Sequence, residues 1–142
     1  MTNCIFCDIL NGTAPASFIY RDELVSAFMD IQPVNPGHIL VIPNQHATYL
    51  SDLDPEHGAQ MFRIGQRMAA SLRQSGVKCE GINLFLADGK VAGQQIFHVH
   101  LHILPRFAED GFGFRRWSFD QPQPSRGELD AMAEIIKNKL KF

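Results

Sequence analysis

Residues 97–105, Phe-His-Val-His-Leu-His-Ile-Leu-Pro, restrict the fold of this chain more than any other stretch. His98, His100 and His102 alternate there with apolar residues. A period of two is typical of a half-buried β-strand, so the three imidazoles should project from one face of a sheet while the apolar side chains face a core. Because three of the chain's six histidines share this strand face, the pattern indicates a chemical site rather than ordinary packing.

Two kinds of site could use three imidazoles on one strand. The Cα atoms of His98 and His102 should lie about 13 Å apart on an extended strand, whereas metal–nitrogen bonds are about 2 Å. One ion shared by all three histidines is therefore disfavoured, although one outer histidine could join a metal site built elsewhere. Neutral imidazole is a nucleophile near pH 7, so the pattern favours attack by the central His100 on phosphorus, with flanking groups setting its tautomer and stabilising charge.

A second motif, Cys4-Ile5-Phe6-Cys7, lies near the N-terminus. Alone it is compatible with a redox pair, a metal site or chance, but no strand precedes it, as a thioredoxin-type motif would require. Two thiolates at this spacing can reach one tetrahedral zinc ion, so a zinc half-site is the favoured interpretation. The missing ligands would be histidines, and His46 and His98 are the candidates. Cys79 fits no pattern.

The composition fits a single domain over residues 1–142 with one hydrophobic core, since 45% of the residues are apolar. A formal net charge of −2 gives no indication of a nucleic-acid or membrane-surface partner. We find no run of about 18 apolar residues that could span a bilayer, and no export signal at the N-terminus. Three cysteines do not make the disulfide framework of a secreted protein, so we expect a cytoplasmic location.

The remaining elements follow from periodicity and end signals. Asp54-Pro55-Glu56 predicts a helix start that Gly76 closes, and Ser125 with Glu128 forms a capping box that begins a final helix over about 125–141. Strands are predicted at 18–20, 24–29, 38–42, 81–86 and through the histidine stretch. The order β-β-β-α-β-β-α indicates an α+β domain with an antiparallel sheet and two main helices.

The histidine stretch resembles the signature of the histidine triad (HIT) family of nucleotide hydrolases and transferases, His-x-His-x-His followed by two apolar residues. Pro36-Gly37-His38-Ile39-Leu40-Val41-Ile42-Pro43 resembles the family's upstream strand, and Gly93-Gln94 matches the Gly-Gln before the triad. The similarity runs from about Cys4 to Pro105. It implies a five-stranded antiparallel meander and a homodimer joined across the helix and the sheet edge.

The resemblance also implies roles for the triad and its neighbours. His100 would attack the α-phosphorus of a purine nucleotide conjugate, and water would then hydrolyse the nucleotidyl-histidine. His102 and His38 would stabilise phosphate charge or set the nucleophile's tautomer. His98 completes the catalytic triad; some bacterial members are similar to this chain in binding structural zinc, which here maps onto Cys4, Cys7, His46 and His98. No organic cofactor is expected.

The substrate-binding residues implied by the resemblance lie in three segments. Asp30, in Phe28-Met29-Asp30-Ile31, would accept both ribose hydroxyls; without the resemblance it would pass as a loop-capping aspartate. Gln94 would donate to phosphate, beside glycines that let backbone N–H groups approach. The apolar slot for the base would be formed by Ile5, Phe6, Ile9, Phe28 and Ile31.

Two departures from the family pattern leave the substrate open. Ala87 stands where many members have a phosphate-contacting Asn or Gln, and Gln95 stands where Ser or Thr is common. The hydrolase could cleave dinucleoside polyphosphates or nucleoside phosphoramidates, and the chain beyond Trp117 resembles the phosphoramidase branch less. Arg115 or Arg116 could pair with a phosphate. The alternative is a nucleotide-binding or zinc-stabilised scaffold with little turnover.

Overall fold

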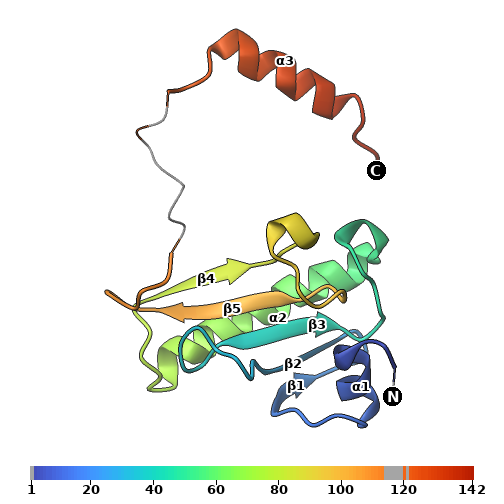
Figure 1. Cartoon of the computed structure of the whole chain (residues 1–142), viewed down its shortest axis with the longest axis vertical. Coiled ribbons are helices and arrows are strands. Elements are labelled where there is room, and N and C mark those ends of the chain that lie inside the picture. The colour runs from blue at the N-terminus through green and yellow to red at the C-terminus, as the bar shows by residue number, and fades with distance from the viewer. Residues whose placement is uncertain (1, 114–119, 121) are drawn as a thin grey trace. The chain divides into compact units, whose positions relative to one another are not determined.

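The structure, a computed structural model, describes residues 2–113, 120 and 122–142 (Figure 1). The chain divides into two compact units, Met1–Phe112 and Gly113–Phe142, which we take in turn. The single domain expected over residues 1–142 stays a prediction. Within the described residues no helix is both long and apolar enough to cross a membrane.

The first unit is built on a five-stranded antiparallel sheet, which confirms the predicted α+β class. Its strands are β1 (Phe18–Arg21), β2 (Val25–Met29), β3 (Ile39–Pro43), β4 (Gly81–Phe85) and β5 (Leu101–Arg106). The spatial order is β1-β2-β3-β5-β4. A strict meander would set β4 beside β3, but helix α2 (Pro55–Gln74) separates them in sequence, so β5 takes the inner position and β4 the edge.

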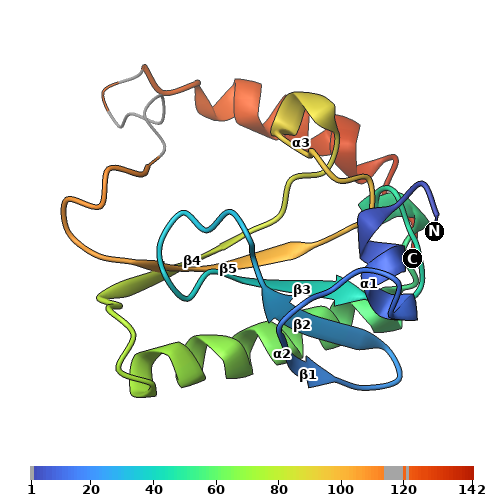
Figure 2. The same ribbon diagram turned by 60° about the horizontal axis from the view of Figure 1, so that its bottom comes forward.

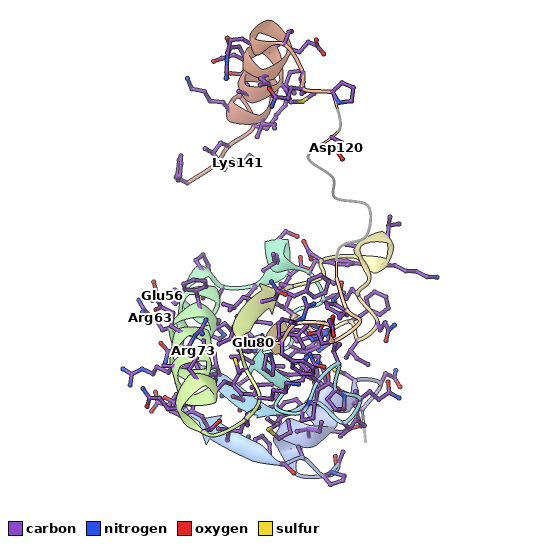
Figure 3. All side chains as sticks on the ribbon, turned by 90° about the vertical axis from the view of Figure 1, so that its left-hand side faces the viewer. Glu56, Arg63, Arg73, Glu80, Asp120 and Lys141 are labelled. Carbon is purple, nitrogen blue, oxygen red and sulfur yellow. The ribbon has the colours of Figure 1, made fainter. Side chains whose placement is uncertain are left out.

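Helix α2 covers one face of the sheet (Figures 1 and 2). It begins as predicted, with the Asp54 carboxylate accepting a hydrogen bond of 2.9 Å from the Glu56 N–H. Its buried face consists of Met61, Ile64, Gly65, Met68 and Leu72. A Cβ on Gly65 would lie only 3.2 Å from Leu101, so this glycine lets the helix approach β5 closely. Figure 3 shows Glu56 and Arg63 on the opposite, outer side of α2.

The other face of the sheet is covered by a short helix, α1 (Ile5–Asn11), which the sequence did not predict. Its buried Phe6 and Ile9 pack against Phe28, Leu40 and Ile42, whereas the neighbouring positions of β2 and β3 pack against α2. Seven residues are too few for a helix to be stable on propensity alone. Packing against the sheet therefore stabilises α1, and its local signals are confined to its ends, where Cys4 caps the start and Gly12 adopts the left-handed conformation at the end.

Strand β5 starts later than the histidine pattern predicts. Only His102 lies within it, and His98 and His100 lie in the irregular segment that precedes it. The last pair that β3 forms with β5 is Val41 with Leu101, and the Val99 N–H instead donates to the Ala47 carbonyl at 2.8 Å. The alternation nevertheless continues, because Val99, Leu101 and Ile103 all join the core beneath α2. The three histidines consequently face the α1 side.

The second unit contains helix α3 (Arg126–Lys137). Ser125 and Glu128 form the predicted capping box, with the Glu128 N–H donating to Ser125 Oγ at 3.2 Å. The helix ends at Lys137 rather than near residue 141. The Lys139 N–H bonds to the Ile136 carbonyl, an i→i+3 bond that tightens the end into a 3₁₀ turn and stops the α-helical ladder. Two further 3₁₀ helices, Leu50–Asp52 and Lys90–Ala92, lie in loops of the first unit.

Candidate active site and metal centre

His100 is held in a single tautomer. Its Nδ1 lies 2.8 Å from the His98 carbonyl oxygen, and because a carbonyl only accepts, Nδ1 carries the proton and donates it. Its Nε2 therefore has a free lone pair. The side chain is buried beside the Phe6 ring, at a centroid distance of 5.1 Å, and this burial lowers the pKa of His100. The lowered pKa favours the neutral imidazole, the form that can act as a nucleophile.

His38 and His102 form a directed hydrogen-bonded pair. The Val34 N–H donates to His38 Nδ1 at 3.1 Å, so the proton of the neutral His38 ring sits on Nε2. That Nε2 lies 2.8 Å from His102 Nδ1, which must accept. The neutral His102 ring therefore carries its own proton on Nε2 and can donate it. Since the His100 and His102 ring centroids are 4.9 Å apart, this donor lies close to the nucleophile.

Asp30 lies at the edge of this pair. Its Oδ2 is 3.5 Å from His38 Nε2, and its side chain is 16% exposed. Its Oδ1 accepts a hydrogen bond of 2.8 Å from the Gln32 N–H, which is the capping role that a loop aspartate can fill. Asp30, His38 and His102 are close enough to hold a metal, but the bond between the two histidines already uses facing ring nitrogens. Contact with ribose stays a prediction.

The five apolar residues expected at the base slot divide into two groups. Phe6, Ile9 and Phe28 are buried together, and the Phe6 and Phe28 rings meet edge to face at 5.6 Å. Ile5 and Ile31 are 45% and 91% exposed. The buried group forms a firm wall next to His100, whereas the exposed pair is available to a ligand.

Gln94 is buried, and its side-chain amide is engaged by the surrounding backbone. Its Nε2 donates to the carbonyls of Thr48 and Ile96, at 2.8 and 3.2 Å, and its Oε1 accepts from the Gly89 N–H at 2.8 Å. Both amide hydrogens are thus engaged, and Gln94 braces the loop before the triad. Direct donation to phosphate stays a prediction that would require this brace to open.

The two positions that depart from the family pattern have contrasting surroundings. Ala87 is buried, and its methyl side chain offers no hydrogen bond. Gln95 is exposed and lines a cavity of about 620 Å³ together with Thr48, His46 and Phe97. The cavity lies on the side of the cysteine pair rather than against His100. Arg115 and Arg116 fall outside the described residues.

The structure brings the four expected zinc ligands together. The potential ligand atoms of Cys4, Cys7, His46 and His98 all lie within 4.8 Å of one another. His98 Nδ1 is 3.5 and 3.6 Å from the two sulfurs and 3.2 Å from His46 Nδ1. Tetrahedral zinc with bonds of about 2.3 Å to sulfur and 2.0 Å to nitrogen gives edges of about 3.5 and 3.3 Å. The residues therefore fit a tetrahedral ion.

The protonation states of this cluster also suit a cation. His98 Nε2 donates to the Pro43 carbonyl at 2.8 Å, which leaves the Nδ1 lone pair for a metal. Burial lowers the pKa of His98 to about 4, so the ring is neutral at pH 7. Burial and the neighbouring Cys4 raise the pKa of Cys7 to about 11. A divalent cation would supply the positive charge that two adjacent thiolates need.

His98 and the partly buried His102 predict a loss of stability in acid. Burial lowers the pKa of His98 and of His102 to about 4 in the folded protein, whereas an unfolded histidine has a pKa of about 6.5. Below about pH 6.5 the unfolded chain binds protons that the folded protein does not. Stability is therefore complete above this pH and falls as the pH drops towards 4. We expect the urea midpoint of unfolding to decrease between about pH 7 and pH 5.

A His102→Gln variant is the matched test of that dependence, because it removes one of the two histidines whose pKa in the folded protein is about 4. The variant should lose part of the decrease in urea midpoint. Asp8 and Asp22 have lowered pKa values, so their protonation in the folded protein falls below this window. A midpoint that stays constant from pH 7 to pH 5 in the unsubstituted protein would contradict the prediction.

Three comparisons with known proteins point to the same family. The model of the HIT domain matches residues 11–109. A HIT family protein from Bacillus anthracis has a crystal structure with a TM-score of 0.90 and 38% identity, covering 98% of each chain. A Zn-bound histidine triad family protein from Mycobacterium smegmatis gives a TM-score of 0.73 at 40% identity, covering 96% of this chain and 98% of that one.

A relative with a named activity is also similar over nearly the whole chain. The adenosine 5'-monophosphoramidase hnt1 of Schizosaccharomyces pombe is 33% identical over 140 residues, which are 98% of this chain and 99% of the relative. The family match spans Asp30, all three triad histidines and the sheet, whereas Cys4 and Cys7 precede it. The chain therefore belongs to the HIT family.

Proposed function

We propose that this protein is a nucleotide hydrolase that cleaves purine nucleotide conjugates at the α-phosphate through a nucleotidyl-histidine intermediate on His100. One observation carries the proposal: the Nδ1–H of a buried, neutral His100 is tied to the His98 carbonyl, which leaves Nε2 as the free nucleophilic atom. The relative named adenosine 5'-monophosphoramidase supports the same class of reaction.

In the first step the lone pair of His100 Nε2 forms a bond to the α-phosphorus while the bond to the leaving group breaks. The electron pair of the broken bond stays on the leaving group, which takes a proton from water. The ring becomes positively charged, and the His98 carbonyl stabilises that charge by accepting the Nδ1–H bond. In the second step water attacks phosphorus, releases a proton to solvent, and returns the nitrogen–phosphorus electron pair to His100.

His102 and His38 assist this transfer in the proposal. The His102 Nε2–H can donate to a phosphoryl oxygen, and the 2.8 Å bond from His38 fixes the tautomer that makes this possible. Asp30 would accept the ribose hydroxyls through its partly exposed carboxylate, with the base against Phe6 and Phe28. Three histidines thus act in distinct roles: nucleophile, donor and positioning group.

Zinc would be structural in this scheme. Cys4, Cys7, His46 and His98 would hold it, and the ion would fix His98, whose carbonyl orients the nucleophile. The Zn-bound relative supports the presence of such an ion in the family. No step of the reaction passes through the metal.

The proposal extends to location and assembly. Free thiols at Cys4, Cys7 and Cys79 suit the reducing cytoplasm. Exposed apolar side chains support a homodimer joined across the helix and the sheet edge, since Phe62 on α2 and Leu84 on β4 are 55% and 39% exposed. A purine nucleotide is the proposed partner, and neither nucleic acid nor membrane is part of the proposal.

Turnover of adenosine phosphoramidate and of diadenosine tetraphosphate, measured side by side, tests the function. We expect release of adenosine monophosphate from at least one of them, and the larger kcat/KM identifies the substrate class. Ala87→Asn and Gln95→Ser restore common family residues at the two divergent positions, and we expect either change to alter the preference between the substrates about tenfold. Absence of turnover on both substrates would contradict the proposal.

A second candidate is a nucleotide-binding scaffold with little turnover. Specific observations favour it: Ala87 offers no side-chain donor, and both amide hydrogens of Gln94 are already engaged. Phosphate would then meet fewer side-chain donors than the family pattern provides. The scaffold predicts nucleotide binding by the unsubstituted protein with no turnover for His100→Ala to abolish.

A further inference from the structure

Asp110 is a buried carboxylate that the proposed mechanism does not use. Its side chain is 2% exposed and accepts hydrogen bonds from Arg106 Nε at 2.6 Å and from a second Arg106 nitrogen at 2.9 Å. The N–H groups of Phe107 and Phe112 also donate to it, at 3.3 and 3.1 Å. The Arg106 guanidinium holds the pKa of Asp110 well below its usual range. The carboxylate is thus a fixed, charged anchor at the end of β5.

Asn35 connects this anchor to the loop before β3. Its side chain is buried, and its Nδ2 donates to Asp110 Oδ2 at 2.9 Å and to the Pro105 carbonyl at 2.9 Å. Both amide hydrogens are therefore used, and both acceptors belong to the segment that follows His102. The loop carrying Asp30 and the chain beyond the triad are joined through this one side chain.

The same loop determines the state of His38. The Asn35 carbonyl accepts the His38 N–H at 3.2 Å, and the adjacent Val34 N–H donates to His38 Nδ1 at 3.1 Å. The Val34 donor is what places the His38 proton on Nε2, where it bonds to His102 Nδ1 at 2.8 Å. A change in the position of residues 34 and 35 would therefore release the tautomer of His38 and, through it, that of His102.

The geometry points to Asn35 as a positioning residue, anchored by Asp110, that holds the Val34 N–H against His38 and so sets the proton positions of the His38–His102 pair. Its catalytic consequence rests on the proposed function, but the tautomer itself does not. The segment from Arg106 to Asp110, which lies outside the site, thereby influences the position of the proton that His102 can donate to a phosphate. Asn35 is unique in this role among the described residues, because it alone bonds to both Asp110 and Pro105.

Asn35→Ala is the direct test, with imidazole nitrogen resonances as the readout. In the unsubstituted protein at pH 7.5 we expect a single tautomer of His38, with the proton on Nε2. In Asn35→Ala the two His38 nitrogens should move towards the averaged shifts of mixed tautomers, and kcat should fall about tenfold with KM changed less than about twofold. An unaltered His38 spectrum in a folded Asn35→Ala protein would overturn the inference.

Glu80→Ala is the matched control for a general loosening of the same segment. Glu80, labelled in Figure 3, accepts the Ala108 N–H at 2.7 Å and does not contact Asn35 in any bond described above. Its removal frees one anchor of residues 107–112 but leaves the Asn35 bonds in place. We expect the His38 nitrogens and kcat to match those of the unsubstituted protein; an equal change in both variants would show that the loop has a merely structural effect.

Asp110→Asn provides a second variant if Asn35→Ala does not fold. It keeps the shape of the anchor and removes the charge that fixes it to Arg106, so the same change in the His38 nitrogens should appear, at smaller amplitude. An unaltered spectrum in this variant would equally overturn the inference. The nitrogen shifts are measured without substrate, so the two failures can be told apart. An unchanged His38 spectrum in the variants would overturn the role of Asn35, whereas absent turnover in the unsubstituted protein would overturn the proposed function.

Discussion

His100→Ala should lower kcat for a hydrolysable nucleotide conjugate by about 10³-fold or more, while nucleotide affinity stays within about threefold. The large loss is expected because in the proposed mechanism the Nε2 lone pair of His100 forms the bond to phosphorus, and no other group would replace it. Affinity should persist because the apolar wall of Phe6 and Phe28 and the Asp30 carboxylate remain. Release of the nucleoside monophosphate measures kcat, and calorimetric titration with adenosine monophosphate measures affinity.

His57→Ala is the matched control, since it removes a histidine from the first turn of α2, outside the site. Its kcat should equal that of the unsubstituted protein. Rapid quenching in alkaline denaturant, in which a nitrogen–phosphorus bond to histidine is stable, followed by mass spectrometry should show one nucleotidyl group on the peptide containing His100, and none in the variant. Retention of turnover by His100→Ala would remove this histidine from the role of nucleophile.

The elements that the sequence predicted are those whose signals are local. Helix α2 follows from Asp54 and Pro55 at its start and from an apolar stripe. Its members Met61, Ile64, Met68 and Leu72 are all buried. The strands follow from short apolar runs, and the alternation through Val99 predicted which side chains enter the core. Such patterns need no knowledge of the partner segment, so a single sequence is sufficient for them.

The elements that the sequence did not predict depend on distant partners. Helix α1 is stable because Phe6 and Ile9 pack on β2 and β3. The start of β5 is set by the last residue pair between β3 and β5, Val41 with Leu101. The engagement of Gln94 with Thr48 joins positions 46 residues apart. Local secondary-structure propensity does not depend on contacts between residues that are distant in the sequence.

The candidate site shows the same division. Spacing along an extended strand argued against one ion shared by all three triad histidines, and the structure places His98 and His102 in separate clusters. Residue chemistry also nominated Cys4 and Cys7 as a metal pair. The positioning groups were missed: Val34 acts through a backbone N–H, and Asn35 reaches Asp110 across 75 positions, so neither leaves a motif. A sequence motif therefore identifies the side chains expected to react more readily than the groups that position them.

Cys4→Ser should abolish zinc binding and lower the melting temperature by about 10 °C or more. The unsubstituted protein, purified without chelator, should contain about one zinc ion per chain by elemental analysis. Cys79→Ser is the matched control, because Cys79 lies outside the four-residue cluster and donates only to the nearby Gly81 carbonyl in the described contacts. It should retain zinc and melt close to the unsubstituted protein. Well under one ion per chain in the unsubstituted protein would contradict the zinc assignment.

Loss of zinc should also lower kcat. This effect would distinguish an ion that positions His98 from an ion with no influence on the reaction. The ion would hold His98 by its Nδ1, while the His98 carbonyl holds the Nδ1–H of His100 at 2.8 Å. Cys4→Ser assayed well below its melting temperature should therefore show a kcat about tenfold lower with nucleotide affinity nearly unchanged. A zinc-free Cys4→Ser protein with full kcat would show that the Pro43 carbonyl, which accepts from His98 Nε2 at 2.8 Å, is sufficient to hold the histidine without the ion.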